Sequence, residues 1–351
     1  MGLPSGVYNV SYLQDMMILR TRFQRVGLVV FLIFLFLIPL FARQYWVDIL
    51  STIATTVIAL QGLNILSGYC GQISVGHSAF MAIGAYTSAI LAARFGLPFW
   101  FCLPCAGLTA GVIGIIFGLP SLKVKGLYLA LTTIAAQFII IYLIKTPFAE
   151  VTGGAIALNV PPVNLGGFVF QTEKQLYHLV IAFTILMTFF ARSLTRSHVG
   201  RAFVAIHNND IAAEAMGINL YRYKLLAFFI GCFYAGISGS LWSVYAKVIS
   251  PDDFTLMNSI WQLGMLIIGG MGATLGPFLG AIFITALNEM VLVAGPMITS
   301  VIPQIGAQIS AALVEMIFGI TLVIFLIYEP RGLAHRWEII KASYTRWPFS
   351  Y

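Results

Sequence analysis

Residues 67–86 read SGYCGQISVGHSAFMAIGAY and interrupt two long apolar runs of the chain. The stretch contains four glycines and the polar residues Gln72, Ser74 and His77. In a bilayer every backbone polar group needs a partner, so irregular backbone persists only where protein buries it or where it lines a water-filled cavity. A break at membrane depth is also typical of the substrate path of transporters. The stretch therefore predicts a broken helix near a pore.

A second glycine-rich stretch resembles the first. Gly269, Gly272, Gly276 and Gly280 are spaced much like the glycines of residues 68–76. Internal repeats of transporters produce paired interrupted segments of this kind. Close packing of glycine-rich helices would produce the same pattern. Both interpretations stay open at this point.

The composition of the chain indicates an integral membrane protein. Of its 351 residues, 60% are hydrophobic and 9% are charged, and the mean hydropathy is +0.93. Soluble globular domains contain roughly 25% charged residues. A soluble enzyme is excluded because it would have too few polar residues for its surface. The net charge of +7 is explained by basic cytoplasmic loops, and no clustered basic face predicts a nucleic-acid partner.

Ten apolar segments approach the roughly 17–25 residues that a membrane-spanning helix needs. They lie at about 26–41, 48–66, 73–93, 99–120, 126–145, 176–191, 225–246, 255–272, 275–294 and 307–328. The sequence thus predicts an all-α, polytopic membrane protein with about ten transmembrane helices. One crossing followed by a re-entrant piece is the alternative for residues 258–294.

Lys and Arg predict the orientation of the chain. With ten crossings and a cytoplasmic N-terminus, 14 of these residues fall inside and 5 outside, which together make the 19 of the sequence. The positive-inside rule therefore favours both termini in the cytoplasm. We expect a cytoplasmic segment at 1–25, a transmembrane domain at 26–330 and a cytoplasmic tail at 331–351. Its two long loops, 146–175 and 195–223, would be periplasmic and cytoplasmic respectively.

The cytoplasmic loop has a helical pattern. Its sequence GRAFVAIHNNDIAAEAMGI at 200–218 spaces apolar residues three and four apart. Residues 208–210 are candidate N-caps, and Gly217 is a candidate helix end. We predict two short helices, or one broken helix, at the cytoplasmic face. The segment would dock into a groove on a partner or, alternatively, lie on anionic lipid.

Ionisable residues are nearly absent from the predicted spans. Glu315 lies within an apolar segment and Glu289 near the edge of one. A charge at the centre of a membrane helix costs roughly 2.5–3.5 kcal/mol on insertion scales. Glu315 is therefore functional or paired with a neighbouring helix or subunit. Ion-driven carriers usually place several carboxylates at mid-membrane, so their scarcity argues against secondary transport.

The sequence predicts no catalytic residue, no metal site and no cofactor in this chain. His77 with scattered serines does not supply a convergent nucleophile and base. Cys102 and Cys105 form a CxxC, but no second CxxC or neighbouring His completes the four ligands of a zinc site. LSGYCGQ at 66–72 is superficially similar to an ATPase signature, yet the chain has no GxxxxGK[ST] phosphate loop. A membrane-embedded enzyme and a passive channel are the alternatives to a transporter subunit.

Several motifs, in order along the chain, resemble the permease subunits of branched-chain amino acid ABC importers. They are residues 62–89, KVKGLYLALTTIA at 123–135, TGG at 152–154, residues 200–218, the run that begins ISPDDF at 249, and YEPRGL at 328–333. The resemblance covers about 45–335. The YEPRGL ending and the N-terminal extension are more similar to the LivM-type subunit than to its LivH-type partner.

The resemblance implies an importer of the bacterial inner membrane. Its solute would be a branched-chain amino acid or a related small polar compound, such as an amide, a urea-like compound or a small organic acid. Its partners would be a LivH-type permease subunit, two ATP-binding subunits that hold ATP and Mg, a periplasmic substrate-binding protein and membrane lipid. Residues 200–218 match the family's ATPase-contacting loop, and Ala213-Glu214-Ala215 followed by Gly217 resembles its EAA-x-G theme.

The candidate site residues fall into three groups. The first lines the translocation path along the break and a facing helix, the second couples to the ATPase, and the third docks the binding protein. They are Asn64, Gln72, Ser74, His77, Tyr128, Thr132 and Thr133 for the path, Gly200, Arg201, Asp210, Glu214 and Gly217 for coupling, and Asp252 and Asp253 for docking. For the polar residues of the break, the alternative role is to hold the broken helix together.

Overall fold

The structure is a computed structural model that describes residues 22–122, 124, 126–164, 169–170, 172–301 and 306–346. Most of the predicted N-terminal segment, the last five residues, Lys123 and Lys125, residues 302–305 and part of the predicted periplasmic loop 146–175 lie outside this range. Nearly all of the described residues are helical. In chain order the main helices are α2 (Arg22–Phe41), α3 (Gln44–Leu63), η1 (Asn64–Tyr69, π-helical), α4 (His77–Phe95), α5 (Phe99–Gly118), η2 (Leu119–Leu122), α6 (Leu127–Lys145), α7 (Ala149–Thr152), α8 (Glu173–Arg196), α9 (His198–Asn208), α10 (Asp210–Ala215), α11 (Leu220–Ala246), η3 (Pro251–Asp253), α12 (Leu256–Gly269), α13 (Gly276–Val301), α14 (Gly306–Tyr328) and α15 (Gly332–Arg346).

Among the described residues, seven helices are long and apolar enough to cross a membrane. Residues of α14 and α15 form a pair bent by 47°, which would make an eighth span if the pair crosses as one. A helix lies at each of the ten predicted segments. However, the apolar part of α2, Val26–Phe41, and the 14-residue α12 are shorter than a full crossing. The chain is therefore a polytopic, all-helical membrane protein.

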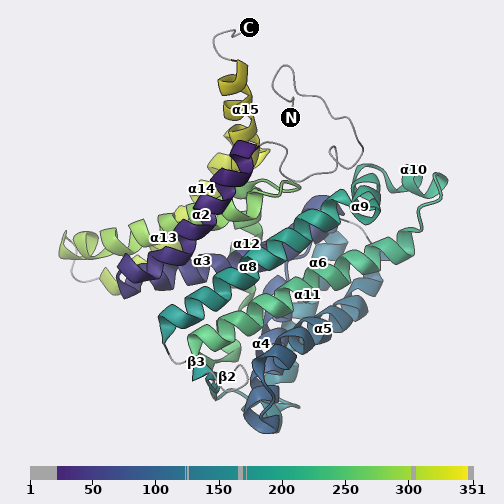
Figure 1. Cartoon of the computed structure of the whole chain (residues 1–351). Helices are drawn as coiled ribbons and strands as arrows, with labels where there is room; N and C mark the ends of the chain where they lie inside the picture. The colour runs from purple at the N-terminus through teal and green to yellow at the C-terminus, as the bar shows by residue number, and fades with distance from the viewer. Residues whose placement is uncertain are drawn as a thin grey trace.

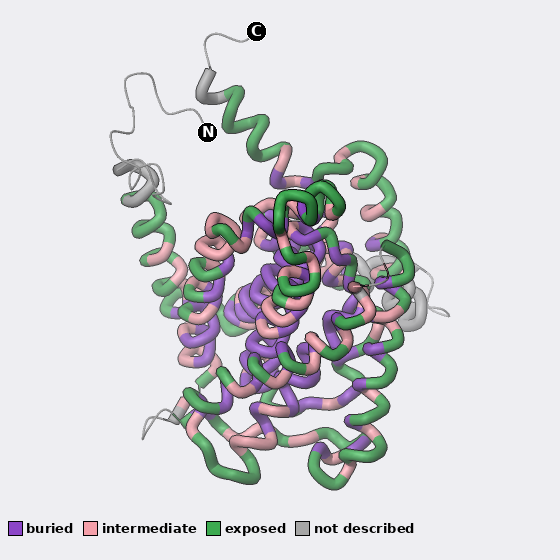
Figure 2. Tube along the Cα trace, turned by 90° about the vertical axis from the view of Figure 1, so that its right-hand side faces the viewer, coloured by how far each residue is buried: buried purple, intermediate pink, exposed green. Residues whose placement is uncertain are grey.

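Helix α11 lies at the centre of the fold and packs most extensively against α5, α4 and α3. Glycines let these helices approach to backbone contact. A Cβ added at Gly84 of α4 would lie 2.2 Å from the carbonyl oxygen of Gly236, and one added at Gly236 of α11 would lie 2.4 Å from that of Ala106. Small residues at helix interfaces favour such packing where lipid removes the hydrophobic driving force. Figure 2 shows the buried residues in the middle of the bundle, and many residues of the core belong to these helices.

The two ends of the bundle differ. At one end lie two short antiparallel ribbons, β1 (Leu158–Asn159) with β4 (Val248–Ile249) and β2 (Val163–Asn164) with β3 (Val169–Phe170). At the opposite end lie α9 and α10 (Figure 1). We call these the ribbon end and the α9–α10 end. Helices α8 and α11 run the length between them.

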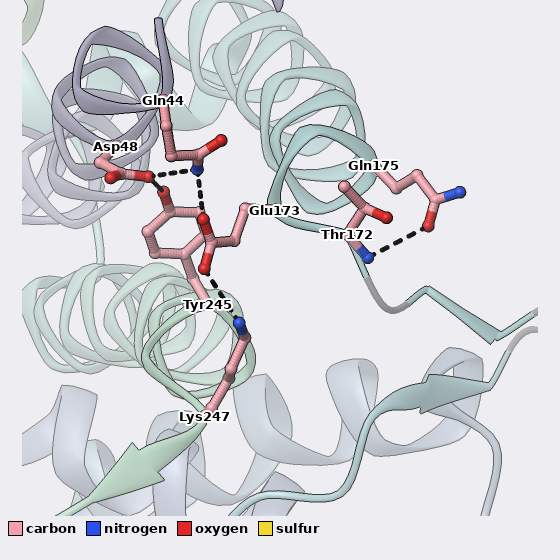
Figure 3. A network of polar contacts seen from close by, with 7 residues as sticks. All are labelled: Gln44, Asp48, Thr172, Glu173, Gln175, Tyr245 and Lys247. Atoms are coloured by element: carbon pink, nitrogen blue, oxygen red, sulfur yellow. Dashed lines mark hydrogen bonds and ion pairs between the residues drawn. The ribbon is translucent and has the colours of Figure 1, made fainter.

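A polar cluster joins three helices at the ribbon end (Figure 3). Gln44 donates to Asp48 at 2.9 Å and also to Glu173, Tyr245 donates to Asp48, and the Nζ of Lys247 lies 3.0 Å from Glu173 Oε1. The cluster thus ties the first turn of α3 to the start of α8 and the end of α11. Alongside it, Thr172 and Gln175 form the capping box at the start of α8.

Candidate translocation site

The predicted break lies at residues 70–76, between η1 and α4. Together α3 and η1 form one span of 26 residues, Gln44–Tyr69. After it the chain turns back along this span, because His77 Nε2 lies 3.1 Å from the carbonyl oxygen of Ala59, near the middle of the span. Helix α4 therefore begins well inside the bundle and not at its end. The π-helical turn before the break is of the kind that often marks functional sites.

The two glycine-rich stretches contact each other. Asn64 Nδ2 donates to the carbonyl oxygen of Ala273 at 2.9 Å, and Asn64 Oδ1 accepts from the amide of Gly272 at 2.8 Å. A Cβ added at Gly68 would lie 2.5 Å from the same Gly272 nitrogen. The side chain of Asn64 thus pairs backbone groups that the break between α12 and α13 leaves without a helical partner. In this arrangement Asn64 holds the breaks together.

A second side-chain amide also bonds backbone groups where helices begin. Gln137, on α6, accepts from the amide of Ala79 at 3.0 Å and from Ser259 Oγ at 3.1 Å, and donates to the carbonyl oxygen of Phe254 at 2.7 Å. Ser259 in turn accepts from the amide of Ser78 at 2.9 Å. Gln137 therefore links the starts of α4 and α12, where helix amides lack intrahelical partners. Sequence reasoning missed it, although an amide within an otherwise apolar helix was the available signal.

The structure brings only some of the predicted path residues together. Ser74 and His77 are fully buried, and Thr133 Oγ1 accepts from the amide of Val75 at 3.0 Å, so Thr133 fixes the break. In contrast, Tyr128 is 70% exposed, and Thr132, on the same helix, is half-buried and bonded to its own turn. Tyr128 and Thr132 do not share a surface with the break in this conformation.

Several buried polar atoms around the break have no protein partner within the described residues. They are Gln72 Oε1, Ser74 Oγ, His77 Nδ1 and, on α12, Gln262 Oε1. Buried polar atoms in proteins are nearly always hydrogen-bonded to protein or to ordered water. These four atoms are therefore available to water or to a polar solute. Their grouping around residues 70–77 distinguishes the break from an ordinary packed core.

A cavity of about 300 Å³ lies on the α9–α10 side of the break. Its walls include Gly71 and Gln72 of the break, Leu129 of α6, Ile206 and Asp210 of α9 and α10, and Lys224 of α11. A second cavity, of about 270 Å³, lies towards the ribbon end, beside Ser88 of α4 and residues 160–164. Of these two cavities, the first is the one that residues of the break line.

Residues 198–217 form two short helices, as the sequence predicts. Ser197 caps α9 by accepting from the amides of Val199 and Gly200, and Asn209 caps α10 by accepting from the amide of Ala212 at 3.1 Å. Gly217 ends α10 with a φ of +85°, which favours glycine. Ser197 and Asn209 therefore set where each helix begins.

The predicted coupling residues divide by position. Arg201 and Glu214 are exposed, whereas Gly200 is packed so that an added Cβ would lie 2.3 Å from the carbonyl oxygen of Thr195. Asp210 is mostly buried and lies 3.6 Å from Lys224. Arg201 and Glu214 are thus placed to contact a partner, while Gly200, Asp210 and Gly217 shape the helices.

Helix α9 also contacts the break directly. His207 Nδ1 lies 2.9 Å from the carbonyl oxygen of Gly68, and the side chain of His207 packs against Gly71. The carbonyl of Gly68 belongs to η1, whose backbone pattern the break interrupts. This contact was not among the sequence predictions, because nothing in the spacing of His207 marks a partner so distant in the chain.

The two aspartates predicted to dock a binding protein lie at the ribbon end. Asp252 is exposed and forms an ion pair with Lys145 at 2.7 Å, and Asp253 accepts from the amide of Ser250 at 2.7 Å. The ion pair joins the end of α6 to η3. Asp252 therefore remains on the surface, while Asp253 caps the turn.

The two acidic residues of the last spans have different surroundings. Glu289 on α13 accepts a hydrogen bond from the hydroxyl of Tyr45. Glu315 on α14 is exposed on the surface of the subunit. Phe318 on the same helix is buried instead and stacks on Trp261. The described residues contain no group of three or more His, Cys, Asp or Glu side chains that would hold a metal ion.

Comparison with known proteins identifies the family of this bundle. Residues 45–326 match the family described as branched-chain amino acid transport system / permease component. The chain belongs to this family of ABC transporter permeases. It is a multi-pass protein of the inner membrane, and the match confirms the resemblance carried by its sequence motifs.

Individual relatives agree with the family. The chain is 32% identical over 291 residues to the high-affinity branched-chain amino acid transport system permease protein LivM of Escherichia coli. The match covers 76% of this chain and 68% of the relative. It is 26% identical over 243 residues to the probable LivM permease of Methanocaldococcus jannaschii, covering 67% and 68%. It is also 26% identical over 206 residues to the guanosine ABC transporter permease protein NupQ of Bacillus subtilis, covering 54% and 63%. No solved structure matches this chain. The likeness is thus to the LivM type of permease.

Proposed function

We propose that this chain is the transmembrane subunit of an ABC importer that moves branched-chain amino acids, or related small polar solutes, into the cytoplasm. The observation that carries the proposal is the contact between His207 of α9 and Gly68 of the broken helix. This contact connects the α9–α10 surface, where an ATPase subunit would bind, to the polar break, where a solute would pass. The chain itself would be non-catalytic, with ATP and Mg bound and hydrolysed on separate subunits.

For the membrane topology we propose ten crossings with both termini in the cytoplasm. Tyr177, at the start of α8, donates to the carbonyl oxygen of Leu35 near the end of α2, so these two helices run antiparallel. The start of α2 therefore lies at the end of α8 that leads into α9. Helix α15 packs on α12 and α13. Gly270, directly after α12, contacts the first turn of α15. The start of α2 and helix α15 at the α9–α10 end support this proposal, because the charge distribution favours that end as cytoplasmic.

Coupling to the ATPase would use the exposed face of α9 and α10. Ile211 and Met216 are 75% and 81% exposed there, beside Glu214. Apolar residues on a short capped helix fit a groove on a partner protein. The alternative is that these residues enter the lipid surface. Recruitment of ATPase subunits, lost on substitution of Glu214 or Arg201, would distinguish docking from lipid contact.

The solute would pass at the interface with a LivH-type permease, along the polar break. Gln72 would contact it at the cavity that it lines. Ser74 and His77 would contact it when the breaks separate, since both are fully buried in this conformation. A ligand drives such a change only if it binds the two states with different affinity. At the ribbon end the substrate-binding protein would dock over residues 146–175 and Asp252.

We propose that the LivH-type subunit also covers Glu315. A carboxylate within a membrane helix is costly in lipid, and Glu315 is exposed on the isolated subunit. A hydrogen-bond donor on the partner would remove this cost.

An enzyme or a passive channel is disfavoured, because the break carries no nucleophile–base pair and a channel would not need the α9–α10 surface.

Reconstitution tests the proposal. The chain is co-expressed with its candidate partners, purified and placed in vesicles, and uptake of labelled leucine is measured with ATP inside. ATP-dependent uptake that requires the binding protein supports an importer subunit. Uptake without ATPase subunits would indicate a channel, and turnover of a solute without transport would indicate an enzyme.

A further inference from the structure

The cavity beside the break has an unusual combination of walls. It measures about 300 Å³ and lies between residues 70–72, α6, α9, α10 and α11. Ligand pockets in proteins run from roughly 300 to 1,000 Å³, so this cavity fits a molecule of amino-acid size. We infer that it binds a zwitterionic amino acid with an aliphatic side chain on the cytoplasmic side of the permease. The inference rests on the proposed function, since it takes the imported solute as the ligand.

An ion pair forms one side of the cavity. Lys224 Nζ lies 3.6 Å from Asp210 Oδ2, and the two side chains are 7% and 18% exposed. A charge-assisted hydrogen bond between such groups is about 2.7–2.9 Å long, so the pair attracts without a direct hydrogen bond. The Lys224 ammonium therefore keeps donors for a further acceptor. A bound zwitterion would present its carboxylate to Lys224 and its ammonium to Asp210, which balances both charges.

The lining also has an apolar part. Val124, Leu129 and Ile206 belong to it. An aliphatic side chain would bury its surface there, with a gain of roughly 25 cal/mol per Å². The lining also contains the polar residues His207, Asn208, Asn209 and Gln72. Gln72 is 4% exposed, and its Oε1 has no protein partner among the described residues. This oxygen would accept a hydrogen bond from the ligand ammonium.

The position of the cavity would let a bound solute regulate transport. Gln72 belongs to the break, whereas Asp210 begins α10. A ligand between them would bind the conformation described here more tightly than a state in which these elements separate. By linkage, a high cytoplasmic concentration of solute would therefore stabilise the conformation described here and slow further import.

The binding test uses the purified transporter complex without its binding protein, with labelled L-leucine as the probe. Unlabelled leucine, leucinamide, which lacks the carboxylate, and 4-methylpentanoate, which lacks the ammonium, are the competitors. We expect saturable leucine binding, with both analogues competing at least about tenfold more weakly. No saturable binding, or equal competition by either analogue, would overturn the inference.

Variants locate the site. Because removing one member of a buried ion pair leaves an uncompensated charge, the test is the neutral double variant Lys224→Met/Asp210→Asn. We expect it to lose at least about tenfold in leucine affinity. The control Lys247→Met removes another Lys–carboxylate ion pair, a more exposed one with Glu173 at the ribbon end, and should leave affinity unchanged. Unchanged binding in the double variant would overturn the site. If the variant does not assemble, the competition series decides alone.

The two proposals fail differently. A complex that imports leucine with its binding protein but shows no binding without it would remove this inference and leave the proposed function intact. A complex that assembles and imports no solute would contradict the proposed function itself.

Discussion

The Nδ1 atom of His207 lies 2.9 Å from the carbonyl oxygen of Gly68, although the two residues are separated by 139 positions in the chain. His207 lies in the last turn of α9, and Gly68 lies in the π-helical turn before the break. Under the proposed function, movement of the α9–α10 surface would reach the broken helix through this short contact. No intervening helix is needed to transmit it.

His207→Ala should weaken coupling. Without the imidazole, α9 loses its hydrogen bond to Gly68 while its exposed face is unchanged. We expect ATP-dependent uptake to fall by about tenfold, with ATPase subunits still bound and ATP still hydrolysed. Uptake and hydrolysis measured on the same vesicles check this. His198→Ala, at the exposed start of α9, is the matched control, and equal effects of the two changes would contradict the role of His207.

Asn64→Ala should destabilise the fold around the paired breaks. The change leaves the amide of Gly272 and the carbonyl of Ala273 without their side-chain partner, and each such buried group costs about 1–3 kcal/mol. We expect a lower thermal midpoint in detergent. Asn258→Ala, which removes an exposed amide from α12, should shift the midpoint far less. A midpoint for Asn64→Ala equal to that of the control would show that the breaks do not depend on this side chain.

Gly84→Ala should disrupt the contact between α4 and α11. The new Cβ would lie 2.2 Å from the carbonyl oxygen of Gly236, a backbone atom that cannot move without shifting a helix. We expect loss of stable expression or a clear drop in thermal stability. Gly27→Ala has nothing within 4 Å of its added Cβ and serves as the control. Normal stability of Gly84→Ala would mean that the helices are further apart than described.

Glu315→Leu should weaken assembly with the LivH-type subunit without weakening the fold of this chain. In the isolated chain the change removes an exposed carboxylate from a membrane helix and should leave stability unchanged or raised. If the LivH-type subunit supplies a donor to Glu315, the variant should co-purify less of that subunit, whereas Met316→Leu on the same exposed region of α14 should not. Undiminished recovery of the partner with Glu315→Leu would place the interface elsewhere.

The broad architecture follows from the sequence because apolar length and the spacing of apolar residues are local signals. The ten predicted segments each contain a helix, and the cap at Asn209 and the helix end at Gly217 were readable from the sequence, whereas the cap at Ser197 was not predicted. The number of full-length spans was less predictable, because α12 starts inside the bundle beside Gln137 and is therefore shorter than a full crossing. Where a helix starts inside a bundle depends on contacts between distant segments, which periodicity does not report.

The site was predictable only in part for the same reason. Glycines and polar residues marked the break, but the sequence could not show which side chains fix it. Asn64 and Thr133 bond backbone groups and hold the break in place, whereas Ser74 and His77 keep polar atoms free. Tyr128 was assigned to the path from its helix alone, and its direction away from the break could not be read from spacing.

The central claim is that residues 70–77 form a solute path whose access is changed by ATP. Ser74→Cys in a background without the native cysteines, assembled with its partners, tests it most directly through the rate of modification by a small membrane-impermeant thiol reagent. Ser74 is fully buried in this conformation, so the account predicts slow labelling in one nucleotide state and at least about tenfold faster labelling in another. No labelling in any nucleotide state, with transport intact, would contradict it.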